Sequence, residues 1–147
     1  MKIVFKPQTE WLPPTDFPDL SKYDEIAVDL ETKDPNLNER LGSGSVIGAG
    51  DVVGISIATV DWCAYYPFAH EGGGNMDRAM VLNWFKDQMK TESTKIFHNA
   101  MYDVCWLRKL GVQINGKIVD TMIAASLVDE NRFRYDLNNC GRDFVGK

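Results

Sequence analysis

The order of elements along this chain predicts an α/β domain with a mixed central sheet and flanking helices. An apolar run over 24–31 predicts the first strand, and residues 51–60 and 62–68 predict two more. The short link 59–61 joins these two strands into a hairpin. Helical and strand patterns then alternate, which is typical of helices packed on a partly parallel sheet.

The later elements follow from periodicity and from their flanking residues. Asn75 is a candidate N-cap for the helix that follows it, Gly111 ends the next helix, and Asp120 caps a third. The predicted helices are 76–90, 99–110 and 120–128, the predicted strands are 95–97 and 117–119, and a further helical turn begins at 135.

The chain of 147 residues has the length of a single domain, 1–147, with one sizeable core. Residues 1–20 contain four prolines and predict an extended lead-in with a short edge strand at 3–5. Residues 33–50 are rich in glycine and other helix breakers, so we expect a long surface excursion there.

The charge balance limits the classes of function. The net charge is −5, whereas a protein that wraps duplex DNA normally carries a basic face. An acidic balance fits a site where carboxylates bind a metal, with basic surface supplied by a partner. It is also a common charge for a protein that simply stays in solution.

Other catalytic and binding classes lack their motifs. The cysteines Cys63, Cys105 and Cys140 form no C-x-x-C, so zinc and redox sites are not indicated. The sequence also has no G-x-G-x-x-G and no G-x-S-x-G, the patterns of dinucleotide sites and of serine hydrolases. No signal peptide or membrane span is visible. We therefore expect a cytoplasmic protein without a membrane partner.

The acidic residues carry the most information. Asp29 and Glu31 end an apolar strand, and residues two apart on a strand share a face, with about 6–7 Å between them. Asp103 follows Asn99 by one helical turn, near the start of the second predicted helix. Three such acids suit Mg²⁺, and two ions about 3.5–4 Å apart can assist phosphodiester cleavage.

Simpler interpretations remain open for each of these residues. A lone D-x-E is often the solvated end of a strand. Asn99 can be only an N-cap, and Asp103 only an acid that favours the helix dipole. His98 is a candidate general base or phosphate contact, or else it ends a strand and packs. These interpretations explain the residues one at a time but not their combination.

Four segments together resemble the DEDD (DnaQ-like) 3′–5′ exonuclease superfamily, whose fold is RNase H-like. The resemblance is strongest to the proofreading exonuclease domain of phage-type family A DNA polymerases. The segments are V-D-L-E-T at 28–32, F-H-N-A-M-Y-D at 97–103, V-D-T-M-I-A-A at 119–125 and Y-D-L-N-N-C-G-R-D-F-V-G at 135–146. The first two match the family's first and second exonuclease motifs.

The resemblance implies a role for each matching residue. Asp29, Glu31 and Asp103 would be catalytic and would hold two divalent ions, Mg²⁺ or Mn²⁺. Asp29 would bridge both ions, Glu31 would also face the terminal 3′-hydroxyl, and Asp103 would hold the second ion largely through water. The substrate-binding residues it implies are Leu30, Thr32, His98 and Asn99.

One family motif has no counterpart. The third motif is Tyr-x-x-x-Asp or His-x-x-x-x-Asp, but Tyr135 is followed four residues later by Asn139. The C-terminal helices and the fourth carboxylate are therefore missing from these residues. We expect weak occupancy by two metals, and exposed apolar surface that favours self-association.

The expected function is 3′–5′ exonuclease cleavage at single-stranded DNA 3′ ends, which releases nucleoside monophosphates. The expected context is proofreading for a polymerase domain downstream or in another chain, in the host cytoplasm if the protein is phage-encoded. Two alternatives stay open. One is an incomplete fragment or pseudo-nuclease that binds nucleic acid or a partner, and the other is an RNA-processing exonuclease.

Overall fold

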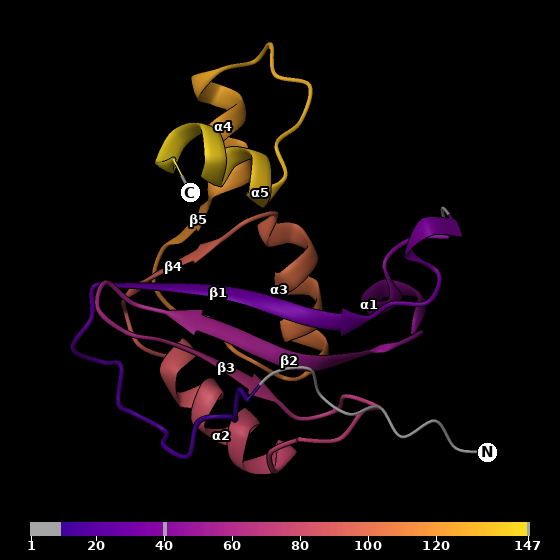
Figure 1. The fold of residues 1–147 in the computed structure, drawn as a ribbon, viewed down its shortest axis with the longest axis vertical. Coiled ribbons are helices and arrows are strands. Elements are labelled where there is room, and N and C mark those ends of the chain that lie inside the picture. The colour runs from indigo at the N-terminus through magenta and orange to yellow at the C-terminus, as the bar shows by residue number, and fades with distance from the viewer. Residues whose placement is uncertain (1–9, 40, 147) are drawn as a thin grey trace.

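The computed structural model describes residues 10–39 and 41–146, and the edge strand expected at 3–5 lies outside them. The fold is a five-stranded mixed sheet with flanking helices (Figure 1). Its strand order is β3-β2-β1-β4-β5. The predicted α/β class is therefore confirmed.

The antiparallel half of the sheet contains β1 (Glu25–Lys33), β2 (Asp51–Ala58) and β3 (Cys63–Pro67). Along β1 the side chains of Ile26, Val28 and Leu30 are buried, as expected for a strand with one face on a core. Asp29 and Glu31 consequently belong to the opposite face.

The parallel half is made of β4 (Thr94–Phe97) and β5 (Ile118–Asp120), and β4 pairs with the beginning of β1. Because β1, β4 and β5 are parallel, the residues after their carboxyl ends lie at one edge of the sheet. The helices α3 (Ala100–Lys109) and α4 (Thr121–Val128) start at this edge, directly after β4 and β5.

The remaining helices are α2 (Arg78–Met89), α5 (Leu137–Cys140), η2, a π-helical turn (Gly141–Val145), and two short helices in the 33–50 excursion, η1 (Leu37–Glu39) and α1 (Gly44–Ile47). The predicted cap of α2 was wrong. The cap is Asp77, whose carboxylate accepts from the Met80 N–H at 2.8 Å. Asn75 instead exchanges two 2.8 Å hydrogen bonds with the backbone of His70.

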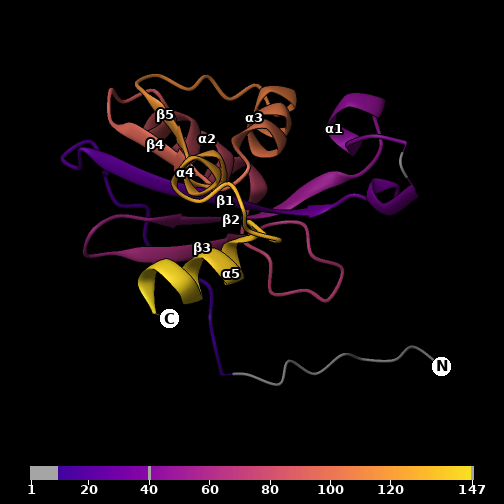
Figure 2. The same ribbon diagram turned by 90° about the horizontal axis from the view of Figure 1, so that it is seen from above.

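The hydrophobic core lies between the sheet and the helices α2 and α3, which are on the same side of β1 and β2 (Figure 2). Its largest fully buried side chains include Trp106, Tyr66, Phe85 and Phe97. The Phe85 ring comes from α2 and Trp106 from α3, so this core fixes both helices on the sheet.

The other face of the sheet is hollowed by an apolar cavity of about 580 Å³. Leu137 from α5 contributes one wall, and α5 lies on this side of the sheet in Figure 2. The cavity is also lined by Trp11, Ala27, Asp29, Ser56, Ala58, Tyr65, Ile96, His98 and Thr121. One of the predicted catalytic acids therefore borders an open apolar space.

In the described part of the chain, no helix has the length and apolar character needed to cross a membrane.

Candidate active site

The end of β1 is shaped by an irregularity in its pairing with β2. Glu31 is opposite Gly54, but Thr32 is opposite Val52, so the register shifts between these two β1 residues. Val53, which this shift leaves without a β1 partner, accepts hydrogen bonds at its carbonyl from the N–H groups of Phe68 and Ala69. Such irregularities re-aim neighbouring side chains and are common beside active sites.

Asp103 is a buried carboxylate in the first turn of α3, with 3% of its surface exposed. Burial, and to a lesser extent the negative charge of Asp29, raises the pKa of Asp103 to about 7. A hydrogen bond from the Leu30 backbone acts in the opposite direction. The fold therefore brings Asp103, from the second motif, next to Asp29 and Leu30 of β1.

Two opposing effects act on the pKa of the Asp29 carboxyl. Burial also raises the pKa of the Asp29 carboxyl, while the nearby His98 acts to lower it. Asp29 and Asp103 are thus two repelling carboxylates at the carboxyl edge of the sheet. Within residues 10–39 and 41–146 neither acid has an ion pair to a basic side chain.

Glu31 lies beside the aromatic ring of Tyr65 on β3. Burial and the charge of Glu31 raise the pKa of Tyr65 to about 12. The phenol fits because Gly54 has no side chain: a Cβ there would be 2.1 Å from the Tyr65 hydroxyl oxygen. The same hydroxyl forms a hydrogen bond with Nε2 of His70.

A divalent cation fits the chemistry of this site, because it would neutralise the repulsion between Asp29 and Asp103. In this structure, however, the acidic side chains do not form a complete set of metal ligands. In the described residues, no group of three or more His, Cys, Asp or Glu side chains is close enough to hold a metal ion. The role of Glu31 as a ligand therefore remains a prediction.

Thr32 belongs to a hydrogen-bonded chain that joins β1 to α3. Its hydroxyl is 2.8 Å from that of Tyr102, which donates to Asp34 at 3.0 Å. The same Asp34 oxygen accepts from the Gly44 N–H at 2.9 Å. These contacts tie the 33–50 excursion to the residue that precedes Asp103 in the sequence.

Asp120 holds the first turn of α3 in place. Its carboxylate accepts from the N–H groups of Asn99 at 3.1 Å and Ala100 at 2.8 Å, and it also caps α4 through Met122 at 2.9 Å and Ile123 at 3.4 Å. Asn99 is the N-cap of α3 in a left-handed conformation, φ 73°, and its side chain makes no capping bond. Asp120 supplies that cap.

His98 uses both ring nitrogens inside the protein. Nδ1 is 2.9 Å from the Thr121 hydroxyl, and Nε2 donates to the Tyr135 carbonyl at 2.6 Å. Both ring nitrogens are therefore engaged by protein atoms. His98 connects the end of β4 to the segment that carries α5.

One residue of the predicted substrate-binding set is buried. The Leu30 side chain is only 7% exposed and packs in the hydrophobic core, so its contact with substrate remains a prediction. Its contribution is the backbone hydrogen bond to Asp103. Sequence reasoning also missed Tyr65, Tyr102 and Asp34 as neighbours of the acids. Of these three, only Tyr102 could have been inferred from the sequence, because it immediately precedes Asp103.

Comparison with known proteins agrees with this geometry. Residues 17–140 match a family model described as 3′–5′ exonuclease. The chain is 30% identical over 136 residues to a DNA-directed DNA polymerase of Pseudomonas phage M6. It is 28% identical over 130 residues to the DNA polymerase DpoZ of Acinetobacter phage SH-Ab 15497. Each match covers 88% of this chain but only 20% and 18% of the respective polymerase.

The fold is also found in solved structures of another protein. NrnC of Brucella melitensis bound to pGG superposes with a TM-score of 0.60 at 20% sequence identity, covering 88% of this chain and 56% of that one. The same protein has been solved with bound Mg²⁺. With a family match that extends over most of its length, the chain belongs to the 3′–5′ exonuclease family.

Proposed function

We propose that this chain removes nucleotides from DNA 3′ ends by hydrolysis, with Asp29, Glu31 and Asp103 holding two divalent metal ions. The observation that carries the proposal is the buried Asp103, whose pKa is raised to about 7 beside a second carboxylate. Unneutralised acids in close proximity are costly to a fold and suit a cation site. When bound, such ions supply activation of water and stabilisation of the leaving oxygen.

The apolar cavity beside Asp29 is the proposed site for the terminal nucleotide. A base could lie against the Tyr65 ring, while the scissile phosphate faces the acids at the sheet edge. Apolar and aromatic walls grip a single-stranded end without reading its sequence. Asn99 and Thr32, at the starts of α3 and of the excursion, would position the strand. The product would be a nucleoside monophosphate.

The proposed context is proofreading. The curated relatives are DNA polymerases of which this chain spans about a fifth, so we propose a polymerase domain as the natural partner. A mismatched primer end frays more readily than a paired end, and single-stranded ends are what this cavity would admit.

Two other functions each have one supporting observation. An RNA-processing role is favoured by the structural likeness to NrnC bound to pGG. A role in binding without cleavage is favoured by the absence, in residues 10–39 and 41–146, of three metal-binding side chains that are close together.

A nuclease assay distinguishes these functions. A labelled single strand of DNA and one of RNA are incubated with Mg²⁺ or Mn²⁺, and shortening from the 3′ end is followed. We expect DNA to be shortened, and Asp29→Asn to reduce the rate by about a hundredfold or more because one stabilising charge is lost. Asp87→Asn, at an exposed position on α2, is the matched control.

Each alternative function predicts a different result in this assay. Faster cleavage of RNA than of DNA would favour the RNA-processing role. No cleavage of either strand by the wild-type chain, even with Mn²⁺, would favour the binding role.

A further inference from the structure

A second cavity lies in the C-terminal segment, outside the acidic site. It has a volume of about 330 Å³ and is lined by Arg132, Phe133, Arg134, Asn139, Arg142 and Asp143. These are three of the six arginines of a chain whose net charge is −5. A concentration of guanidinium groups on an acidic protein indicates a site for an anionic ligand.

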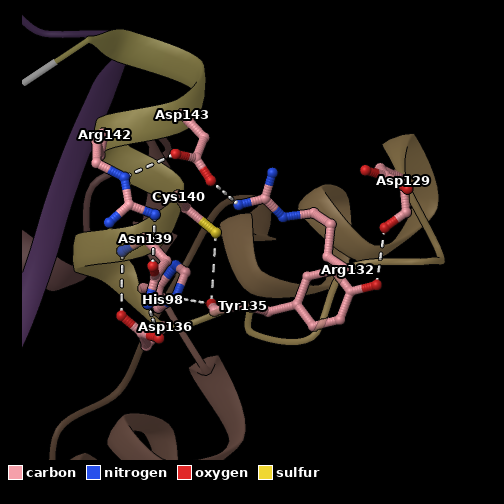
Figure 3. A network of polar contacts seen from close by, with 9 residues as sticks. All are labelled: His98, Asp129, Arg132, Tyr135, Asp136, Asn139, Cys140, Arg142 and Asp143. Carbon is pink, nitrogen blue, oxygen red and sulfur yellow. Dashed lines mark hydrogen bonds and ion pairs between the residues drawn. The ribbon is translucent and has the colours of Figure 1, made fainter.

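The guanidinium groups of this arginine cavity are held in place. Asp143 accepts from Arg132 at 2.6 Å and from Arg142 at 2.9 Å, one from each side (Figure 3). Arg142 also donates to the Asn139 side chain at 2.7 Å. Arg132 lies over the Phe144 ring at 4.8 Å from its centroid. Asp143 thus serves two of the three arginines that line the cavity, and the charge of Asp136 acts on Arg134 and Arg142. Three guanidinium groups against these two carboxylates leave one excess positive charge.

Arg132 also has an unused donor. Its Nε is buried and has no hydrogen-bond partner in the described part of the chain. Buried polar groups are normally paired, so an orphaned donor in an arginine-lined cavity suggests an acceptor supplied by a ligand.

An aromatic ring stands between two of these arginines in the sequence. Phe133 is fully exposed, whereas most large aromatic side chains of this protein pack in or against the core. An exposed ring next to guanidinium groups is a stacking platform of the kind used for single-stranded nucleic acid. Phosphates pair with the arginines while a base stacks on the ring.

The arginine cavity is connected to the acidic site. His98 donates to the Tyr135 carbonyl at 2.6 Å, and Cys140 Sγ contacts the same oxygen at 3.5 Å, so Arg134 is next to a fixed residue. Two residues further on, Leu137 lines the apolar cavity that Asp29 also borders. The two cavities are therefore linked by residues 134–137, along which a bound strand would extend from one to the other.

We propose that the arginine cavity binds the phosphodiester backbone and one base of single-stranded DNA upstream of the 3′ terminal nucleotide. The inference rests on the proposed function only for the direction of the strand. Its chemistry, phosphate on guanidinium and base on phenyl ring, is independent of cleavage.

The test measures binding in EDTA, where no cleavage occurs. A 5′-labelled thymidine decanucleotide is titrated by fluorescence anisotropy against wild type, Phe133→Leu, Phe133→Trp and Arg134→Gln. Phe133→Leu should weaken binding about tenfold because stacking is lost, whereas Phe133→Trp should retain the wild-type affinity.

The salt dependence of binding measures the contribution of the arginine charges. Arg134→Gln should reduce the slope of log affinity against log salt by about 0.7, the value for one phosphate contact on a single strand. Arg108→Gln, an exposed arginine at the end of α3, should leave the slope unchanged. All three positions are exposed, and circular dichroism checks that each variant is folded.

The outcomes separate this proposal from the proposed function. If wild type cleaves nothing but Phe133→Leu weakens binding, the exonuclease proposal fails and the arginine cavity stands. If both variants bind like wild type with the same salt slope, the arginine cavity is excluded even when cleavage occurs. Unmeasurable binding of the decanucleotide by wild type excludes it as well.

Discussion

At the residue scale, the most consequential group is the Asp103 carboxyl. Its pKa is raised to about 7 by burial and by Asp29, against an ordinary value of 3.8. In the folded protein it therefore holds a proton over a pH range in which it would be ionised in the unfolded chain. Its protonated form stabilises the fold, and ionisation above that range carries a cost.

This gives a pH prediction for the metal-free protein. The contribution of Asp103 to stability is fully present below about pH 4 and is lost as the pH rises to about 7, roughly 2–4 kcal/mol in all. Asp103→Asn should remove this loss, so that the variant gains stability relative to wild type between pH 5 and pH 8. Urea unfolding of the variant and of wild type at pH 5 and at pH 8 measures this difference in stability.

The control for this prediction is Asp87→Asn, at an exposed aspartate on α2. Its difference from wild type should be the same at both pH values. If the difference in unfolding free energy between Asp103→Asn and wild type were also the same at both pH values, the pKa of Asp103 would not be raised in the folded state.

At the element scale, the first turn of helix α3 is capped by a residue from strand β5. Asp120, at the end of β5, accepts hydrogen bonds from the first turns of both α3 and α4. The helix that carries Asp103 is therefore positioned by a cap that no local sequence around Asn99 provides.

Asp120→Ala should lower the free energy of unfolding by about 2–3 kcal/mol, more than the ~1 kcal/mol typical of a single cap. Four backbone N–H groups lose their acceptor at once. Denaturant unfolding measures the loss, and Asp136→Ala is the matched control because Asp136 caps only the short α5. Equal losses in the two variants would show that Asp120 does not act on both helices.

The sequence predicted the elements better than their connections. The alternation along β1 placed Asp29 and Glu31 opposite the core because a period of two is local. The same alternation turns Leu30 toward the core, where its side chain is buried. Asp120 was predicted to cap α4, but its bonds to α3 depend on β4 and β5 being neighbours.

Other parts of the site depend on pairing that a single sequence does not specify. Tyr65 meets Glu31 only because β3 pairs with β2 in a particular register and Gly54 lies between them. The Tyr102–Asp34 contact requires the 33–50 excursion to fold back on α3. Long-range contacts of this kind have no periodic signature.

At the scale of the whole molecule, apolar side chains are concentrated on the surface of α4. Ile123, Leu127 and Val128 are 56%, 82% and 74% exposed. Exposed apolar side chains of this kind, together with the open apolar cavity on the sheet, favour contacts between copies of the chain.

We therefore expect the isolated chain to self-associate as its concentration rises. Light scattering should show an increase in mass that Leu127→Lys reduces. Val60→Lys is the matched control, because Val60 is 94% exposed but lies in the turn between β2 and β3. A single monomeric mass for the wild-type chain at every concentration would contradict the prediction.

The absent Cβ of Gly54 has a consequence for how such sequences can diverge. Any larger residue at this position would displace the Tyr65 phenol, and a smaller residue in place of Tyr65 would leave a gap above Gly54. The two positions are therefore expected to covary among related sequences, with a side chain at 54 accompanied by a shorter one at 65. Because this pair lies next to Glu31, such paired changes would alter the floor of the site while leaving its acids in place.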